Sequence, residues 1–478
     1  MQKRPPAPPL ADAARCTKRK ATDQKQITSH TTKEPPQQCT SVLFKEQLLK
    51  VAKPSLNIGA ATSKSLTPLN YDAAPPINQY NGWTAPTKDY ELPTIDIADV
   101  TPETFYTKYI QCRRPVVLKG VLPDLSLLEQ WKDFNYLLEK VDQSVMVEKR
   151  SSDKDSFGKG NEIKMNFRCF LELIRGGDDT HYLTTQDVRA NSDGRPELMS
   201  PLMKSLSSDF PLRPLLMGNL VPQNINMWLG NSKDGTSSGL HHDYHDNLYI
   251  LIKGRKRFRL YSPLETDKMY TRGELFRVHP NGRINYKGEE TTAYGADLLS
   301  DTAAFASRQR REAEKVLEEA ERAMGEGAPE AKEQLERAEQ QLEKAIDAVL
   351  DAEMLCEDDV ESESGSCNEE YEYGDRPRLV DKTVKNPSNF SEVGTDCLND
   401  EEKLKHKYPL MLLANAAFCD IEAGSILYLP ASWFHEVTSY GESLALNYWF
   451  HPPDGHDFTS PYSSDFWPND YRESFEDC

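Results

Sequence analysis

The chain has 478 residues and a formal net charge of −19, and only 38% of its residues are apolar while 28% are charged. This length could hold two or three domains, but the composition favours one domain of roughly 250 residues with unpacked segments around it. The negative charge argues against a general nucleic-acid binder, which needs a basic face for the phosphate backbone.

The cysteines and the apolar runs indicate where the protein works. The nine cysteines include no Cys-x-x-Cys, so we expect ordinary thiols in a reducing compartment. The first residues lack the apolar stretch of a signal peptide, and the longest uncharged apolar run, residues 408–419, is too short to span a bilayer. We therefore expect a protein of the cytoplasm, the nucleus or both, with no membrane partner.

Residues 1–88 are rich in Pro, Thr, Gln and Lys and show no sustained period, which predicts a disordered arm. Residues 1–50 carry ten Lys or Arg against four Asp or Glu. The cluster Lys18-Arg19-Lys20 is a candidate nuclear-import signal, although a short basic cluster in such an arm more often does nothing specific.

Regular patterns begin near Tyr90. A helix-like stretch at residues 101–112 precedes the apolar strand Val116-Val117-Leu118, and short strands and helices then alternate to about residue 298. We predict that residues 89–298 form the first part of a folded domain.

Residues 299–380 differ in composition and look like an insertion into that domain. Ala, Glu, Arg, Lys, Gln and Leu dominate residues 303–353, with a Gly/Pro break at 325–329, which predicts two antiparallel helices. In the second helix, small and apolar residues follow the 3-4-3-4 spacing of a coiled coil: Leu335, Ala338, Leu342, Ala345 and Val349. Residues 351–375 then carry eleven Asp or Glu and no Lys or Arg, which predicts an acidic disordered linker. The helices of residues 303–353 could offer a surface to a partner protein.

The domain is expected to resume at residues 381–457, where the segments 424–430 and 443–450 have the pattern of strands. Residues 458–478 mix aromatic and acidic residues and form a C-terminal tail to which we assign no structure.

His241 and Asp243 have the i, i+2 spacing that places two side chains on one face of a strand. Two imidazoles and one carboxylate form the facial triad of non-haem Fe(II) oxygenases, which leaves positions open for a 2-oxoacid and O2. An isolated His-x-Asp is common by chance, so a third ligand is needed. His435 follows Trp433 and Phe434 in an apolar strand-turn-strand segment, where a histidine is usually a core residue, but the context favours a ligand here.

Strand parity extends this interpretation to Lys256. If the strand continues from His241, the side chains of Asn247 and Tyr249 point to the same face. The segment Lys253-Gly254-Arg255 then has the composition of a hairpin turn, and antiparallel pairing places Lys256 on that face as well. A buried ammonium group needs an anion, and the distal carboxylate of 2-oxoglutarate would supply it. Alternatively, Lys256 extends to water among the charges around it.

Taken together, these motifs resemble the JmjC family, the cupin-related 2-oxoglutarate oxygenases, over roughly residues 91–298 and 386–457. The matching segments are Ser238-Gly239-Leu240-His241-His242-Asp243, Asn247, Gly254-Arg255-Lys256, Tyr428-Leu429-Pro430-Ala431-Ser432-Trp433-Phe434-His435 and Asn447-Tyr448-Trp449. The resemblance implies a mainly β fold, namely a double-stranded β-helix (jelly-roll, cupin-like) with flanking helices and the inserted helical hairpin.

The resemblance also implies roles for individual residues. His241, Asp243 and His435 would bind Fe(II). The residues implied in contacts with 2-oxoglutarate are Lys256, Ser238, Asn247 and Tyr182. Those implied in the wall of the substrate cavity are Asn447 and Trp449. For Tyr182, Ser238 and Asn447, plain strand packing is the alternative interpretation.

The implied reaction is the decarboxylation of 2-oxoglutarate to succinate and CO2 with O2, coupled to hydroxylation of an aliphatic C–H bond. Residues 227–230 and 429–435 resemble the small JmjC hydroxylases, which favours a side chain of a protein or peptide as substrate, with lysine as one candidate. The alternative within the same chemistry is N-methyl-lysine demethylation on histones, although no zinc-finger pattern of a reader module accompanies it. A non-catalytic scaffold acting through the helical insertion is a third hypothesis, against which the complete triad and Lys256 argue.

Overall fold

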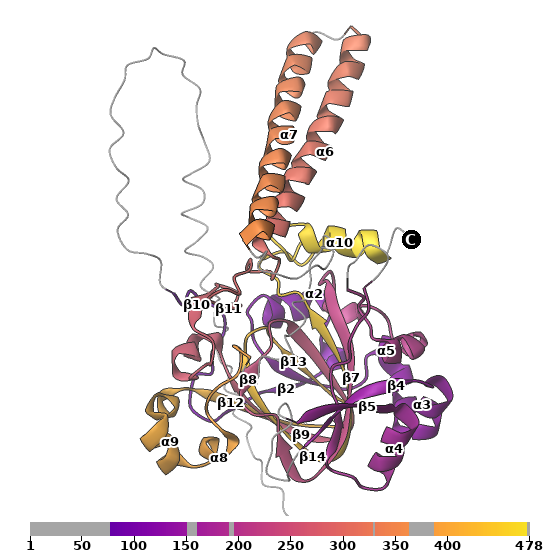
Figure 1. Cartoon of the computed structure of the whole chain (residues 1–478), viewed down its shortest axis with the longest axis vertical. Helices are drawn as coiled ribbons and strands as arrows, with labels where there is room; N and C mark the ends of the chain where they lie inside the picture. Colours follow the sequence, from indigo (N-terminus) through magenta and orange to yellow (C-terminus); the bar gives the residue numbers. More distant parts are fainter. Residues whose placement is uncertain (1–76, 151–159, 191–195, 328–329, 363–386, 476–478) are drawn as a thin grey trace, which may run out of the picture. The chain divides into compact units, whose positions relative to one another are not determined.

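The computed structural model describes residues 77–150, 160–190, 196–327, 330–362 and 387–475 (Figure 1). Most of the predicted N-terminal arm and most of the acidic linker lie outside these residues. Residues 77–88, which we assigned to the arm, pack onto the domain, since Tyr80 is buried and donates a hydrogen bond from its hydroxyl to Trp83 O at 2.7 Å. The folded part therefore begins before the predicted boundary at residue 89.

Fourteen strands are present among the described residues: β1 Tyr90–Glu91, β2 Thr94–Asp96, β3 Val116–Lys119, β4 Ser144–Lys149, β5 Asn161–Asn166, β6 His181–Leu183, β7 Pro222–Ser237, β8 His241–His242, β9 Asp246–Tyr261, β10 Leu275–Val278, β11 Ile284–Tyr286, β12 Ala416–Glu422, β13 Ser425–Leu429 and β14 Phe434–Phe450. The α-helices are α2 Pro102–Phe105, α3 Phe134–Lys140, α4 Phe167–Arg175, α5 Pro201–Ser205, α6 Leu298–Gly325, α7 Ala331–Ser362, α8 Thr395–Leu398, α9 Glu401–Lys407 and α10 Phe466–Phe475. The 3₁₀-helical and π-helical segments are η1 Ile97–Asp99, η2 Tyr106–Ile110, η3 Pro123–Lys132, η4 Ser207–Asp209, η5 Leu215–Met217, η6 Pro263–Lys268 and η7 Pro409–Leu413.

Twelve of the strands form one sheet, whose main path runs β2-β3-β13-β9-β14-β7-β6-β4-β5. The two long strands β9 and β14 pair with each other on both sides of a bend. The first half of β9 also pairs with β13, whereas its second half also pairs with β12. The sheet therefore folds back on itself and encloses an interior, which confirms the predicted mainly β, jelly-roll class.

The bend in β9 corrects one detail of the sequence interpretation. We expected a hairpin turn at Lys253-Gly254-Arg255, but β9 continues through these residues, and Gly254 adopts a φ of +95°. The register between β9 and β14 shifts at the same place. Before the bend odd-numbered residues face inward, and after the shift even-numbered residues do. The evidence is that Phe258 and Leu260 pack in one buried cluster with Tyr249 and Leu251. The predicted facing is confirmed although the predicted turn is wrong.

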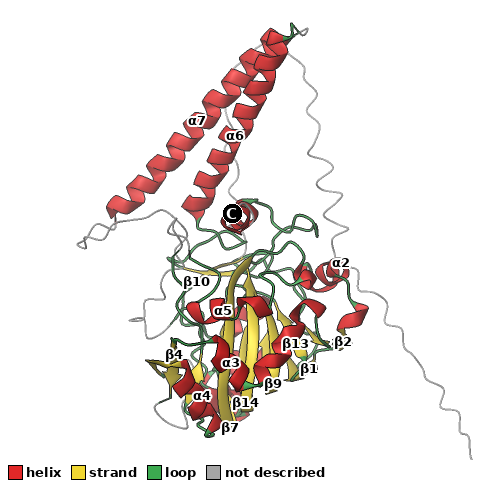
Figure 2. Cartoon of the chain, turned by 90° about the vertical axis from the view of Figure 1, so that its right-hand side faces the viewer, coloured by secondary structure: helices red, strands yellow, loops and turns green. Residues whose placement is uncertain are grey.

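Helices cover the outer side of the sheet. Figure 2 shows α3, α4 and α5 beside β4, β7 and β14. The largest buried cluster lies here, and it joins Trp131 of η3 and Phe167 and Phe170 of α4 to Leu229 of β7 and Leu446 of β14. These residues bury the outward-facing side chains of the long strands, so the strands are fixed from outside and their inner face is left for the site.

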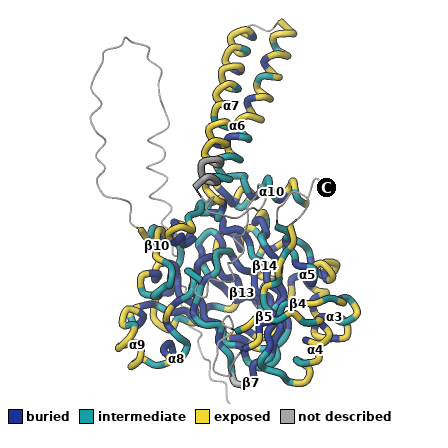
Figure 3. Tube along the Cα trace, viewed as in Figure 1, coloured by how far each residue is buried: buried dark blue, intermediate teal, exposed yellow. Residues whose placement is uncertain are grey.

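Between β11 and β12 the chain forms the inserted helical hairpin, as predicted. Helix α7 continues to Ser362, however, so residues 351–362, which we assigned to the disordered linker, are helical. Helices α6 and α7 pack side by side (Figures 1 and 2). Buried alanines recur every seven residues in both helices: Ala306, Ala313 and Ala320 in α6, and Ala331, Ala338, Ala345 and Ala352 in α7. Figure 3 shows buried positions along two otherwise exposed helices. Small side chains along this line allow the two backbones to approach closely.

The predicted C-terminal tail contains helix α10, whose Trp467 is buried and donates its indole N–H to Tyr294 O at 2.8 Å. An ion pair joins Asp465, just before α10, to Arg308 of α6. Within the described ranges, no helix has the length and apolarity needed to cross a membrane.

Candidate metal centre

The three side chains that the sequence suggested as metal ligands meet at one point. Strand β8 pairs with the start of β14, and this register places His241 directly opposite His435, with ring centroids 4.3 Å apart. Asp243 follows β8, and its Oδ2 lies 3.8 Å from His435 Nε2. One possible ligand atom from each of the three residues lies within 4.8 Å of the other two.

Both imidazoles are oriented by backbone carbonyls. Nδ1 of His241 lies 3.0 Å from Gly239 O, and Nδ1 of His435 lies 2.9 Å from Trp433 O. A carbonyl oxygen only accepts hydrogen bonds, so Nδ1 carries the proton in each ring and Nε2 keeps its lone pair. This is the arrangement in which histidine binds a metal, with the second nitrogen fixed by a hydrogen bond.

Burial and the neighbouring His435 lower the pKa of His241 to about 4. The imidazole is therefore neutral near pH 7 and can act as a ligand without first losing a proton. Two imidazole nitrogens and one carboxylate oxygen form a donor set that fits Fe(II).

Lys256 lies on the inner face of β9 and is only 3% exposed, so the interpretation in which it extends to water is wrong. Its Nζ donates a hydrogen bond to the Tyr182 hydroxyl at 3.1 Å and lies 5.5 Å from the ring centroids of both Tyr182 and Tyr249. Burial lowers the pKa of Lys256 to about 7.

No carboxylate of the described residues forms an ion pair with Lys256, and the buried Tyr249 hydroxyl has no hydrogen-bond partner among them. A buried cation next to a tyrosine whose buried hydroxyl has no partner fits an anionic group that binds there. The carboxylate of 2-oxoglutarate is such a group.

Two further predicted residues, Asn247 and Asn447, lie in the wall of the interior. Both are buried, and Asn447 Nδ2 lies 3.4 Å from Asn247 Oδ1. Asn447 also accepts a hydrogen bond from the indole of Trp228 at 2.6 Å. Trp449 is the cross-strand partner of Asn247, and its ring meets that of Trp228 edge to face at 6.3 Å. The structure thus brings Asn247, Asn447 and Trp449 together.

Ser238 is placed differently. Its hydroxyl donates to Gly239 O at 3.0 Å and accepts from Val437 N at 3.1 Å, so it joins β7 to β14 beside the carbonyl that orients His241. These contacts match the packing alternative and do not include Lys256. His242 points away from the site, as strand alternation requires, and its Nε2 contacts the Tyr286 hydroxyl at 2.8 Å.

Sequence reasoning missed Phe390. Its ring stacks on His241 with centroids 4.9 Å apart and an interplanar angle of 12°, and the two residues form a β-bridge. Phe390 belongs to the segment that returns from the insertion, and no spacing in the sequence links it to β8. Trp228 was also missed. It lies two and four residues after Asn226 and Asn224, which are buried, so strand alternation along β7 could have identified it as an inward residue.

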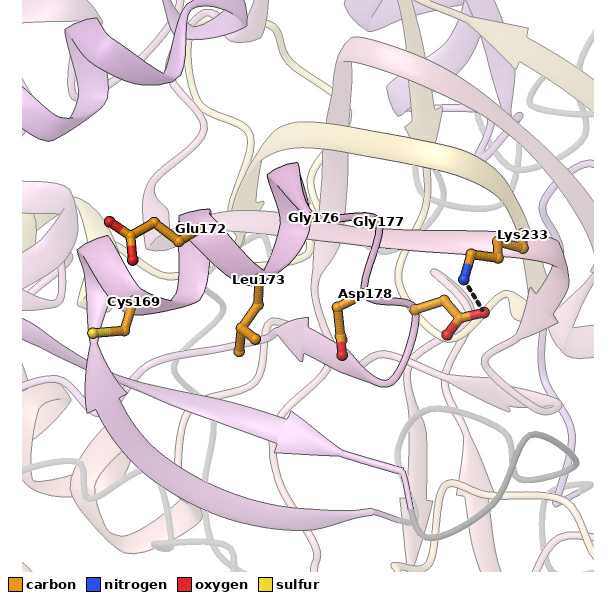
Figure 4. Close-up of a pocket in the computed structure, with 8 residues that line it drawn as sticks. Cys169, Glu172, Leu173, Gly176, Gly177, Asp178 and Lys233 are labelled. Carbon is orange, nitrogen blue, oxygen red and sulfur yellow. Dashed lines mark ion pairs between the residues drawn. The ribbon is translucent and has the colours of Figure 1, made fainter.

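A surface hollow with a volume of about 640 Å³ lies elsewhere. None of the predicted site residues lines it. Figure 4 shows its rim, which includes Cys169, Glu172 and Lys233. Lys233 pairs with Asp179 at 3.7 Å, and Asp178 contacts His181 Nδ1 at 2.8 Å. These charged groups already have partners, so we assign no chemistry to this hollow.

Comparisons with known proteins agree with this geometry. The family model of the cupin-like domain matches residues 102–456. The chain is 35% identical to the JmjC domain-containing protein 4 of Schizosaccharomyces pombe, over 81% of this chain and 90% of that protein. It is 21% identical to the human bifunctional peptidase and (3S)-lysyl hydroxylase JMJD7, over 73% and 81% of the two chains. It is 22% identical to the lysine-specific demethylase JMJ32 of Arabidopsis thaliana, over 73% and 79%.

Proposed function

Because the chain belongs to the JmjC family of cupin-like proteins, we propose that it is an Fe(II)- and 2-oxoglutarate-dependent oxygenase that hydroxylates a side chain of a protein substrate. The observation that supports this most strongly is the convergence of His241, Asp243 and His435 within 4.8 Å. The buried Lys256 adds the cation that a 2-oxoacid needs at its far end.

In this proposal the three ligand atoms are Nε2 of His241, Nε2 of His435 and a carboxylate oxygen of Asp243. Bound iron and 2-oxoglutarate supply the oxidising chemistry, in which O2 converts 2-oxoglutarate to succinate and CO2 and an aliphatic C–H bond is hydroxylated. The protein has no need of a nucleophilic side chain for this reaction.

The chain's own residues hold, orient and shield the reactants. The carbonyls of Gly239 and Trp433 fix the two imidazoles before metal binds, which removes their rotational freedom in advance. Lys256 and the Tyr182 hydroxyl fix the distal carboxylate. The apolar inner side chains keep water from the site, and they include Leu251, Phe258, Leu260, Leu427 and Leu429.

Lysine is the substrate residue that the relatives support. The human relative is named a lysyl hydroxylase, and the Arabidopsis relative is named a lysine-specific demethylase. Demethylation of N-methyl-lysine is therefore the second candidate function, because it uses the same iron site and the same first hydroxylation step on an N-methyl carbon.

A peptide-library turnover assay with Fe(II), 2-oxoglutarate and O2 separates the two candidates. We expect mass spectrometry to show the gain of one oxygen atom on lysine-containing peptides, and no change when 2-oxoglutarate is omitted or when Lys256→Met is used. Loss of one methylene unit from methyl-lysine peptides, without oxygen gain on unmethylated ones, would replace hydroxylation by demethylation as the function.

A further inference from the structure

A buried ion pair, Arg113 with Asp246, lies close to the metal centre but includes none of its ligands. Arg113 Nη1 donates to Asp246 Oδ2 at 2.9 Å, and Nη2 donates to Oδ1. Arg113 is 3% exposed and Asp246 is fully buried. The planar guanidinium and the carboxylate thus meet in a bidentate geometry that fixes their relative orientation.

The same carboxylate accepts two further hydrogen bonds from other parts of the chain. The Tyr428 hydroxyl of β13 donates to Oδ2 at 2.7 Å, and the backbone N–H of Ala431 donates to Oδ1 at 2.9 Å. Each oxygen of Asp246 therefore accepts two hydrogen bonds. They join the segment before β3, strand β13 and the turn before β14 at one point.

Asp246 itself and the turn before β14 both lie close in the sequence to metal-binding residues of the proposed function. Asp246 follows Asp243 by three residues, and Ala431 precedes His435 by four. The turn is also bonded directly to the first ligand segment, because Ser432 N donates to Asp243 O at 2.7 Å. The backbone on both sides of Asp246 is thus tied to the residues that position the carboxylate of Asp243 and the ring of His435.

Backbone strain at two of these positions indicates that the arrangement is imposed. Arg113 has a φ of +55° and Ser432 a φ of +59°, in the left-handed region that residues with a side chain rarely adopt. Such conformations persist where surrounding contacts fix them, and they concentrate at functional sites. The Ser432 hydroxyl accepts a further hydrogen bond from Ile284 N at 3.1 Å, which holds the strained turn from its other side.

We propose that Asp246, held by Arg113, Tyr428 and Ala431, is a positioning residue that sets the geometry of the iron ligands. This inference rests on the proposed function, since the ligands concerned are those of the iron. A buried ion pair contributes little net stability compared with apolar residues of the same volume, so folding alone does not explain it. The four directional hydrogen bonds accepted by Asp246 fix the distance between the segment of Asp243 and the segment of His435.

The test compares two matched tyrosine substitutions. Replacing Asp246 itself leaves the buried Arg113 unpaired and endangers folding. Tyr428→Phe removes only one hydrogen bond to Asp246 and keeps the ring, which packs edge to face on Phe105.

The control is Tyr136→Phe. It removes one hydrogen bond of 2.9 Å to Asp209, another buried carboxylate, which also accepts from the Trp131 indole and from Lys140. Asp209 lies in η4, and its hydrogen-bond partners Trp131, Tyr136 and Lys140 belong to η3 and α3 on the outer side of the sheet.

The dissociation constant of Fe(II) and the ligand-field absorption of the Co(II)-substituted protein are measured for both full-length variants. We expect Tyr428→Phe to weaken Fe(II) binding about tenfold and to change the Co(II) spectrum. We expect Tyr136→Phe to melt at a lower temperature but to keep the affinity and spectrum of the unmodified protein. Unchanged affinity and spectrum in Tyr428→Phe would overturn the positioning role alone, whereas an unmodified protein that binds no Fe(II) would overturn the proposed function together with it.

Discussion

Lys256 has its ammonium group in the interior of the sheet, between the rings of Tyr182 and Tyr249. Burial lowers its pKa to about 7, so the group is only partly charged at neutral pH before a ligand arrives. A carboxylate bound beside it favours the ammonium form and raises the pKa again. Ligand binding and protonation of Lys256 are therefore linked.

We predict a pH dependence of 2-oxoglutarate binding from this linkage. Below about pH 7 Lys256 is already charged, and the dissociation constant should be flat. Above that pH each binding event takes up one proton, so the dissociation constant should rise by up to about tenfold per pH unit. Isothermal titration calorimetry in two buffers with different ionisation enthalpies measures both the affinity and the proton uptake.

Lys256→Arg provides the control, because a guanidinium stays charged throughout this range. Its dissociation constant should be weaker in absolute terms but independent of pH. A pH-independent dissociation constant and no proton uptake in the unmodified protein would contradict the role of Lys256.

The residues of the metal centre were predictable to different degrees. His241 and Asp243 follow from a local spacing, because alternation along a strand places them on one face. His435 could not be settled from local pattern, since a histidine between aromatic residues also fits a core. Its role depends on the register of β8 against β14, which joins residues 194 positions apart in the sequence. Phe390 was not predictable at all, because its contact with His241 depends on where the insertion returns.

At the scale of elements, the bend in β9 connects the metal centre to Lys256. The segment Lys253-Gly254-Arg255 has the composition of a turn, and a turn and a bend both need a glycine with positive φ. Only the partner strands distinguish them, because β14 continues alongside β9 on both sides of Gly254. The sequence therefore predicted which face Lys256 occupies but not the path by which the strand reaches it.

We predict that Gly254→Ala destabilises the protein and also weakens 2-oxoglutarate binding. At a φ of +95°, an added Cβ would lie 2.4 Å from Glu442 O and 2.9 Å from the Cα of Ser443, and both are backbone atoms of β14. The strands must separate at the bend, which should cost about 3 kcal/mol or more of unfolding free energy. Urea denaturation measures the stability, and a 2-oxoglutarate titration measures the displacement of Lys256.

Gly177→Ala is the matched control, since Gly177 has a φ of +80° but nothing lies within 4 Å of an added Cβ. It should cost only the backbone strain of about 1 kcal/mol and leave ligand binding unchanged. Equal losses of stability in the two variants would show that contact with β14 does not matter at Gly254.

The segment that follows the insertion lies closer to the site than the sequence suggested. Residues 388–391 return from it between two segments of the domain: Ser391 N donates to Leu240 O at 2.9 Å, and Gly273 N donates to Ser388 O at 3.0 Å. Phe390 reaches His241 from this position. The sequence predicted that an insertion lies between strands, but not that the segment after it lies against the metal-binding strand.

For the whole molecule, the class of fold was predictable because the strand motifs and their spacing are local. The helical hairpin was predictable for the same reason, and the residues of the expected seam in α7 are buried or half-buried. The matching line of buried alanines in α6 was not predicted, since alanine alone gives little apolar periodicity. The early start of the domain at Tyr80 was also missed, because those residues are buried only through contacts with distant segments.

The central claim is that the fold assembles an iron site that consumes 2-oxoglutarate. Succinate formation by the full-length protein with Fe(II), 2-oxoglutarate and O2 tests this most directly, in the unmodified protein, in His241→Ala and in His406→Ala, which changes an exposed histidine of α9. We expect succinate from the unmodified protein and from His406→Ala, and none above background from His241→Ala. Equal succinate formation with and without the His241 imidazole would contradict the claim.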